Sequence, residues 1–326
     1  MTISEPSVAL GVLAALSALL LAATARDFRP APLSVATAVL AVAAVSIAPD
    51  LGVIALVLLL LAAAQLRATG DLGPVRSAGL AAGLLAVAML AATPDPRSGR
   101  LAALVAALAL AGAVGLVPHL AEAEEGDTGR TAVAMRAFVM PSVAFALFER
   151  VHAALPPGSF RVFGGVLLAL GCANVLWGLA GALTDDEERA WRYAYSADWG
   201  LALIGLGLLS PDGSAGAFLM LLSVLLLRLP LLFRPSNWLA AAALAGLAPF
   251  GGFVARLLIL RAATAVAWPL ALALGLALVL WLPATRRQLQ PGSRARGRAL
   301  IAQLAPLGVT LAAGIYPAGF LRPLGL

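Results

Sequence analysis

The sequence contains no lysine, so all 22 basic side chains among its 326 residues are arginines. A buried lysine readily gives up its proton, whereas an arginine effectively never does. A proton relay that uses lysine is therefore excluded for this chain. A GC-rich genome can produce the same bias without mechanistic meaning, so the positions of the arginines decide what the bias means.

Cysteine and charge are also scarce. The single cysteine, Cys172, excludes an intramolecular disulfide and any cysteine-rich metal or cluster site. Only 12% of the residues are charged, whereas ordinary soluble domains have about 25%. The mean hydropathy is +0.97. This composition predicts a polytopic membrane protein, and we attribute the net charge of +6 to arginine-rich loops rather than to nucleic-acid binding.

Apolar runs recur along the whole chain, and we predict an all-α integral membrane protein. A helix needs about 20 residues to cross the hydrocarbon core, and the shorter runs indicate tilted or broken helices. We count 12 spans, or 13 if one run is broken in two at Pro249. The runs are Val8–Ala25, Leu33–Ala48, Leu51–Leu66, Ser77–Ala92, Leu101–Val117, Ala132–Val151, Val162–Leu183, Ala197–Leu209, Ala215–Phe233, Trp238–Leu260, Thr264–Leu282 and Ile301–Tyr316.

Ionisable residues divide the chain into two parts. Residues 1–100 have none inside an apolar run and are expected to pack and to contact lipid, whereas residues 101–326 form the core that carries the charges. A central charge costs roughly 2.5–3.5 kcal/mol and usually faces the bundle interior or a partner. Arg228 and Arg256 lie deepest and are the stronger functional candidates. The other charges within or beside spans are Arg136, Glu149, Arg150, Asp198 and Arg261, of which the three arginines can snorkel to the surface.

Two prolines predict broken helices. Pro141 lies in the middle of its run, and Pro249 is followed by Gly251 and Gly252. A mid-helix proline removes one backbone hydrogen bond and kinks or breaks the helix. At membrane depth the freed carbonyls must be met by protein or water. Two such breaks in corresponding halves are typical of inverted-repeat transport folds, so we expect an inverted-repeat bundle broken near 141 and at 249–252.

The loops suggest an orientation. The densest basic cluster lies within residues 285–298. The positive-inside rule places this loop on the cytoplasmic side of the cell inner membrane, and the C-terminus is then expected on the outer face. The polar stretches Pro118–Arg130 and Thr184–Gly200 are expected to be solvated loops. An interfacial aromatic belt is expected from tryptophans near run ends, namely Trp191, Trp199, Trp238, Trp268 and Trp281.

A family resemblance appears at the second break. The segment LAGLAPFGGFVARLLILRAA (Leu244–Ala263) resembles the "LAGIPPLAGFxGKF" signature of the antiporter-like membrane subunits of respiratory complex I, energy-converting hydrogenases and Mrp-type antiporters. Further stretches follow in the family's order, and the resemblance covers about Leu101 to the C-terminus. These stretches are Leu116–Val151, Gly181–Gly207, Ser223–Phe233 and Gly308–Leu321.

The departures from the family pattern concern its exchangeable residues. The lysine of the family's first broken helix falls on or beside Pro141, and the lysine of "GKF" becomes Arg256. The lysine of the family's "FKALLF" becomes, at best, Arg228. Of the family's "PFHxWLP" element, only Pro118 and His119 remain. The resemblance therefore implies a divergent, shortened member.

The resemblance implies a membrane subunit of a complex-I-like or hydrogenase-like redox and ion-translocating assembly. Its partners would be sister membrane subunits and a peripheral redox arm, and this chain would be a non-catalytic subunit without a cofactor or metal of its own. We expect a structural or electrostatic role rather than independent proton pumping. The candidates for an ion pathway are Arg256, Arg228, His119 and Asp198, of which the last two could exchange protons locally.

Two other functions stay open. A stand-alone secondary transporter could use Arg228 and Arg256 to bind an anionic substrate between broken helices, because arginine binds carboxylate or phosphate in a bidentate manner. A membrane-embedded transferase could hold a divalent metal with the acids of Glu122–Asp127 and Asp185–Glu188, although contiguous acids are more typical of a solvated loop.

Overall fold

The structure, a computed structural model, describes residues 5–24, 32–48, 50–69, 73–93, 95–114, 127–184, 187–228, 238–287 and 298–326. Every regular element in these ranges is helical, and the described part of each predicted apolar run contains at least one helix. The first half contains α1 (Glu5–Thr24), α2 (Pro32–Ile47), α3 (Leu51–Thr69), α4 (Gly73–Ala91), α5 (Pro96–Val114), α6 (Asp127–Ala154) and the short η2 (Pro157–Ser159). The second half contains α7 (Phe160–Thr184), α8 (Glu187–Gly207), α9 (Pro211–Ser223), η3 (Val224–Arg228), α11 (Trp238–Ala245), α12 (Gly251–Val266), α13 (Trp268–Arg287), α14 (Arg298–Ile315), α15 (Pro317–Leu321) and η4 (Arg322–Leu324).

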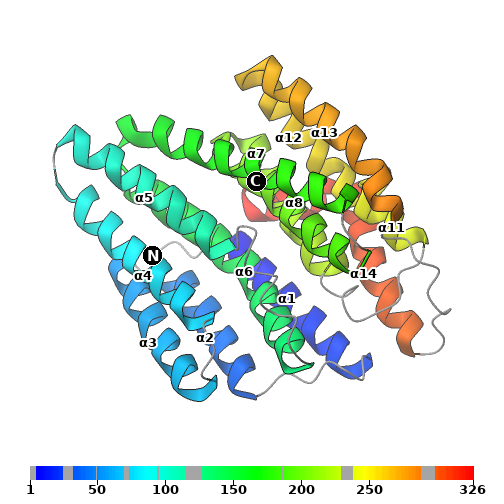
Figure 1. Cartoon of the computed structure of the whole chain (residues 1–326), viewed down its shortest axis with the longest axis horizontal. Helices are drawn as coiled ribbons and strands as arrows, with labels where there is room; N and C mark the ends of the chain where they lie inside the picture. The colour runs from blue at the N-terminus through cyan, green and yellow to red at the C-terminus, as the bar shows by residue number, and fades with distance from the viewer. Residues whose placement is uncertain are drawn as a thin grey trace.

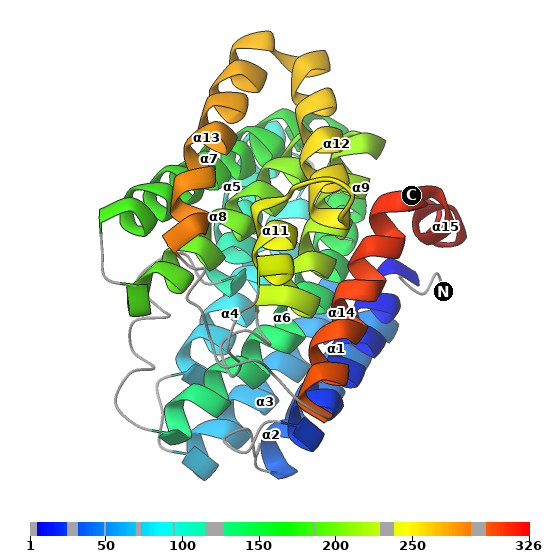
Figure 2. The same ribbon diagram turned by 90° about the vertical axis from the view of Figure 1, so that its right-hand side faces the viewer.

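The helices form an elongated bundle (Figure 1). Neighbours in sequence pack on one another from α3 to α4 to α5, and α5 then contacts α7. From there the packing continues through α8 and α9 to α12 and α13. Helices α1 and α6 pair in the middle, and α14 lies against α1 (Figure 2). The start of α1 and the C-terminal residues lie on the same side of the bundle (Figure 2).

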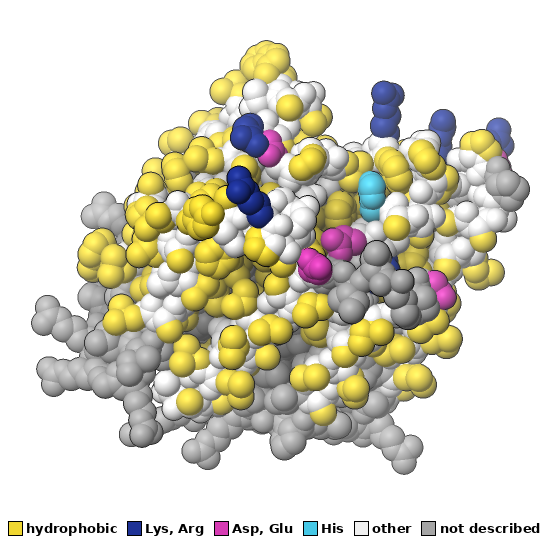
Figure 3. Space-filling view, turned by 180° about the vertical axis from the view of Figure 1, so that it is seen from behind, with side chains coloured by type: hydrophobic (Ala, Val, Ile, Leu, Met, Phe, Trp, Pro, Cys, Tyr) yellow, Lys and Arg dark blue, Asp and Glu magenta, His cyan; other side chains and the backbone are white. Residues whose placement is uncertain are grey.

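The bundle is built for an apolar surrounding. Large hydrophobic side chains point outward on many helices, among them Leu60 (71% exposed), Met89 (73%) and Trp268 (69%). Hydrophobic side chains are spread over the whole described part of the face in Figure 3. Among the described residues, α1, Pro157–Leu183 and Pro211–Arg228 are by themselves long and apolar enough to cross a membrane. The stretch Leu304–Leu324, bent by 105° between α14 and α15, adds a fourth, and the chain is an all-α membrane protein.

Glycines let the central helices approach closely. A Cβ on Gly178 of α7 would lie 2.4 Å from the carbonyl oxygen of Tyr193 on α8, and one on Gly200 would lie 2.7 Å from that of Gly171. Membrane helices associate through such small residues because lipid offers no hydrophobic driving force between them. The hydroxyl of Ser196 also donates to Oδ1 of Asn174 at 3.0 Å, which fixes α7 against α8.

The second predicted break is confirmed, because α11 ends at Ala245 and α12 begins at Gly251. The first prediction needs correction: α6 runs from Asp127 to Ala154 with Pro141 inside it. A proline removes one hydrogen bond from the ladder but does not end a helix whose two sides are held by neighbouring helices. An irregularity that the sequence did not predict lies instead at the end of α9, where Val224–Arg228 forms a π-helix.

Two smaller expectations also change. The stretch Thr184–Gly200 was expected to be a solvated loop, but α8 begins at Glu187 and residues 194–200 are buried. Trp238 and Trp268 are exposed as an aromatic belt requires, whereas Trp199 and Trp281 are buried at 2% and 4% exposure. The indole rings of these two fill the interior between helices. Trp191 lies where no side chain is described.

Candidate functional site

Three charged side chains meet inside the second half of the bundle, and we call them the Asp198 cluster: Asp198, Arg228 and Arg256. They come from α8, the π-helix η3 and α12 and are 3%, 3% and 5% exposed. Nε of Arg228 donates to Oδ2 of Asp198 at 2.5 Å. Nη2 of Arg256 lies 3.6 Å from Oδ1 of the same carboxylate. One aspartate thus stands between two arginines.

The cluster lies near the middle of the bundle's span. Asp198 precedes the end of α8 at Gly207 by nine residues, and Arg256 precedes the end of α12 at Val266 by ten. At 1.5 Å per residue these distances are about 14 and 15 Å. The hydrocarbon core is about 30 Å thick, so a bilayer whose edge met these helix ends would place both residues about halfway through it. Charges at that depth are costly and are typical of functional or assembly sites.

The broken helix holds Arg256 in place. Nη2 of Arg256 donates to the carbonyl oxygen of Leu244, in the last turn of α11, at 3.0 Å. Gly246 follows with φ of +71°, a conformation that favours glycine. A Cβ added to Gly246 would lie 1.4 Å from Nη1 of Arg256, so the guanidinium packs on the glycine backbone. The break at 246–250 therefore makes the space that the arginine occupies.

The π-helix brings Arg228 to the cluster. Residues 224–228 are all buried, and the hydroxyl of Ser17 on α1 donates to the carbonyl of Leu225 at 3.4 Å. The guanidinium carbon of Arg228 lies 5.8 Å from the ring centre of Trp281 on α13, in cation–π range. Such single π-turns occur frequently at functional sites. Neither Trp281 nor Leu244 could be predicted as a partner from the sequence, because both contacts depend on the packing of separate helices.

The cluster has a net formal charge of +1, since two guanidinium groups face one carboxylate. Among the described residues, Nε and Nη1 of Arg256 and the buried hydroxyl of Ser223 have no hydrogen-bond partner. Burying charges is favourable only when the geometry and the remaining hydrogen bonds compensate for lost hydration. The cluster is therefore suited either to shift the electrostatic potential at neighbouring groups or to bind an anion.

Near Pro141 the chain places hydroxyl groups rather than charges. The hydroxyl of Ser7 on α1 donates to the carbonyl of Ser142 at 2.8 Å, and the hydroxyl of Ser142 donates to the carbonyl of Ser7 at 3.0 Å. Both serines are at most 1% exposed. This reciprocal pair joins α1 directly to α6, in the part of α6 where Pro141 lies. No titratable side chain takes part in these two bonds.

The other candidates lie apart. His119 and most of Glu122–Asp127 and Asp185–Glu188 lie outside the described residues. Gly251 and Gly252 are buried in the first turn of α12, and Arg261 forms an exposed bidentate pair with Asp212. The structure thus brings Asp198, Arg228 and Arg256 together and leaves Pro141 elsewhere.

Comparison with known proteins identifies the architecture. No family model matches the sequence, and no curated protein matches it. Among solved structures, a chain of respiratory complex I from Thermus thermophilus aligns with 99% of this chain at a TM-score of 0.74 and 21% identity. The chain has the antiporter-like fold.

Other structures with the antiporter-like fold come from related assemblies. A chain of the membrane-bound sulfane sulfur reductase, an archaeal respiratory membrane complex, aligns with 97% of this chain at a TM-score of 0.74 and 17% identity. A chain of the Mrp complex from Dietzia sp. aligns with 86% at a TM-score of 0.67 and 20% identity. Our chain covers 86% of the complex I chain, but only 65% and 38% of these two. These identities establish the fold alone.

Proposed function

We propose that this protein is a membrane subunit of a complex-I-like or hydrogenase-like assembly and that its role is structural and electrostatic. Its partners would be sister membrane subunits and a peripheral redox arm, and it would not pump protons independently. The antiporter-like fold supports the membrane part of this proposal. The Ser7–Ser142 contact supports a structural role without independent proton pumping. Two buried hydroxyl groups join α1 to α6 at the place where the family resemblance expects an exchangeable lysine.

The Asp198 cluster supports the same conclusion from the other half of the bundle. Arg256 stands where the family resemblance expects a lysine, and an arginine effectively keeps its charge. A fixed positive charge at mid-membrane can bias neighbouring groups but cannot itself take up and release a proton. We further propose that loop 285–298 faces the cytoplasm, because the positive-inside rule favours that side for its arginines, and that the C-terminus lies on the outer face of the cell membrane.

Co-purification tests the proposal directly. The tagged chain is solubilised in mild detergent and captured, and its partners are identified by mass spectrometry. Recovery with sister membrane subunits and a hydrogenase-like or dehydrogenase-like arm is expected. A homogeneous monomer or homodimer under conditions that preserve other membrane complexes would contradict it.

A second function is favoured by one observation, the excess positive charge of the Asp198 cluster. A stand-alone transporter of an anionic substrate could use the donors of Arg256 and the hydroxyl of Ser223, which lack partners among the described residues. Such a protein would be recovered alone and would bind a carboxylate or phosphate compound. Binding of that compound should then be lost in Arg256→Ala.

A further inference from the structure

The start of α12, just after the break, has features that attract an anion. Its first turn contains Gly251 and Gly252, and the N-cap residue, Phe250, makes no side-chain cap. The first N–H groups of a helix have no partner within it, and the helix dipole adds a partial positive charge at this end. Anions bind at such helix ends. Here two buried side chains add further donors.

Arg256 and Ser223 bring these donors to the first turn of α12. A Cβ added to Gly252 would lie 3.5 Å from Oγ of Ser223 and 3.7 Å from Nη1 of Arg256. The two side chains are buried, at 6% and 5% exposure. Among the described residues, neither Oγ of Ser223 nor Nη1 of Arg256 has a hydrogen-bond partner. A buried donor without an acceptor is costly, so a ligand that accepts from both would stabilise the fold.

The charge around this point is positive. Arg256 shares the carboxylate of Asp198 with Arg228, so the three side chains keep a formal charge of +1. A water molecule could accept from the donors but would leave this charge, whereas an anion compensates both. The third neighbour of the added Cβ is the carbonyl oxygen of Ala243, at 3.3 Å. That oxygen already accepts the N–H of Gly246 at 3.2 Å, which reduces its repulsion of an anion.

The surroundings limit the size of the ligand. A single methyl carbon on Gly252 would already lie within 3.7 Å of atoms from α9, α11 and α12. Helix α14 closes the break from another side, because a Cβ on Gly314 would lie 1.9 Å from the carbonyl oxygen of Pro249. A carboxylate or phosphate group would have to place several heavy atoms here. The geometry therefore favours an anion of one atom.

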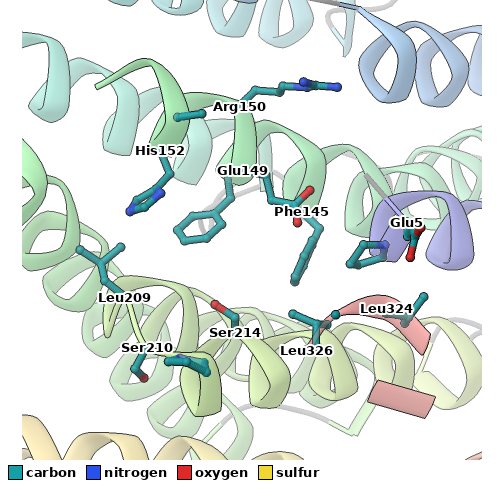
Figure 4. A pocket seen from close by; sticks show the side chains of 15 residues that line it. Glu5, Phe145, Glu149, Arg150, His152, Leu209, Ser210, Ser214, Leu324 and Leu326 are labelled. Atoms are coloured by element: carbon teal, nitrogen blue, oxygen red, sulfur yellow. The ribbon is translucent and has the colours of Figure 1, made fainter. Parts of the chain in front are cut away.

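The cleft at the chain ends does not offer such donors. It has a volume of about 590 Å³, and Ser210, which precedes α9, lies on its wall (Figure 4). The hydroxyl of Ser210 already accepts the N–H of Gly213 at 3.1 Å, and Asp212 adds a negative charge in the first turn of α9. Arg150 of the same lining directs its guanidinium away from the cleft (Figure 4) and donates to the carbonyl of Ser46. Of these two helix starts, that of α12 is the one suited to an anion.

We propose that a chloride ion binds at the start of α12, held by the N–H groups of its first turn, the hydroxyl of Ser223 and Nη1 of Arg256. Binding brings the formal charge of the Asp198 cluster from +1 to zero. The site deepens the proposed electrostatic role, on which its functional meaning rests, because chloride occupancy sets the charge that neighbouring groups experience. Binding itself needs no partner subunit.

Chloride-dependent stability tests the site. The protein, with any subunits that co-purify, is unfolded thermally in detergent while chloride replaces gluconate at constant ionic strength, so that screening stays the same. A ligand of the folded state raises the melting temperature with its concentration, and chloride and bromide should both do so. Gly252→Ala, whose methyl occupies the site without changing a charge, should lose this response. Gly275→Ala, which adds a methyl in open space on α13, should respond as the wild type does.

No chloride response in the wild type, or a response that Gly252→Ala retains, would overturn the proposal. A response to phosphate or acetate that Gly252→Ala abolishes would overturn the choice of a monatomic anion. If Gly252→Ala does not fold, Ser223→Ala provides the test, because it removes one donor to a charged ligand. The chloride concentration that gives the same rise in melting temperature should then increase about tenfold, and an unchanged concentration would contradict the site.

The outcome is separate from that of the co-purification experiment. Recovery of the chain alone, with the chloride response intact, would contradict the assembly and support the site. Recovery of the assembly without a chloride response that depends on Gly252 would support the assembly and contradict the site.

Discussion

Arg228 donates a hydrogen bond from Nε to Oδ2 of Asp198 at 2.5 Å, and both side chains are buried at 3% exposure. The same carboxylate lies 3.6 Å from Nη2 of Arg256. Asp198 on α8 is thus the shared counter-charge of Arg228 on η3 and Arg256 on α12. Removing any one of the three charges should leave the other two without full compensation and should lower the stability of the protein.

Asp198→Asn should destabilise the protein strongly. The substitution leaves two guanidinium groups close together without a counter-charge, and breaking a buried ion pair costs about 3–5 kcal/mol. Thermal unfolding in detergent measures the loss. Asp212→Asn is the matched control, because Asp212 pairs with Arg261 in an exposed bidentate contact and should have little effect. Similar losses of stability in both variants would show that the burial of Asp198 does not add to the cost of removing its charge.

Gly246→Ala should displace Arg256. Its φ of +71° costs a residue with a Cβ about 1–3 kcal/mol, and the new methyl would also overlap Nη1 of Arg256. Gly275→Ala, in α13 with open space around the added methyl, should be neutral or slightly stabilising. Melting temperatures of the two variants give the comparison. A tolerated Gly246→Ala would mean that the guanidinium is not fixed on the glycine.

Arg256→Lys should lower stability without creating proton transport. An ammonium is a point charge without the planar fork by which the guanidinium meets the Leu244 carbonyl and approaches Asp198. In the first half of the bundle, the Ser7–Ser142 contact would still provide no titratable group that could pass a proton on. Proton uptake by reconstituted vesicles measures transport. Transport gained by the lysine variant would show that a complete pathway is present.

Ser7 and Ser142 should each contribute to stability. Each hydroxyl donates to the backbone carbonyl of the other residue, so Ser7→Ala and Ser142→Ala should each remove one hydrogen bond between membrane helices. Each loss should be about 0.6 kcal/mol, the average for such bonds, and at most about 1.7 kcal/mol, as measured by unfolding in detergent. Because both accepting carbonyls remain, the losses should be close to additive in the double variant.

Ser98→Ala, which removes an exposed hydroxyl with local partners, serves as the control and should have little effect. Unchanged stability of both single variants would show that these bonds do not stabilise the contact between α1 and α6.

The sequence predicted the elements better than their contacts. Each predicted apolar run contains a helix, and the proline and glycines at 249–252 correctly predicted the break between α11 and α12. The depth of Arg228 and Arg256 in their runs pointed to buried positions. These features could be predicted because each depends only on the residues of a single short segment.

The pairing of Asp198 could not be predicted in this way. It stands in a polar stretch that is typical of a loop, and its partner Arg228 is 30 residues away. The stretch can form the buried first part of α8 because its polar side chains have partners on other helices. Ser196 bonds to Asn174, and Asp198 pairs with the two arginines of the cluster. Pro141 shows the converse, because packing against α1 lets α6 continue where the local signal predicted a break.

We propose that this chain supports an assembly without carrying protons itself. Proton translocation by the purified, reconstituted assembly with Arg256→Ala in this subunit tests this role. We expect a lower yield of assembled complex, while the complex that does assemble translocates protons with the wild-type stoichiometry. A fully assembled complex whose proton translocation is abolished would show that this subunit takes part in proton transport.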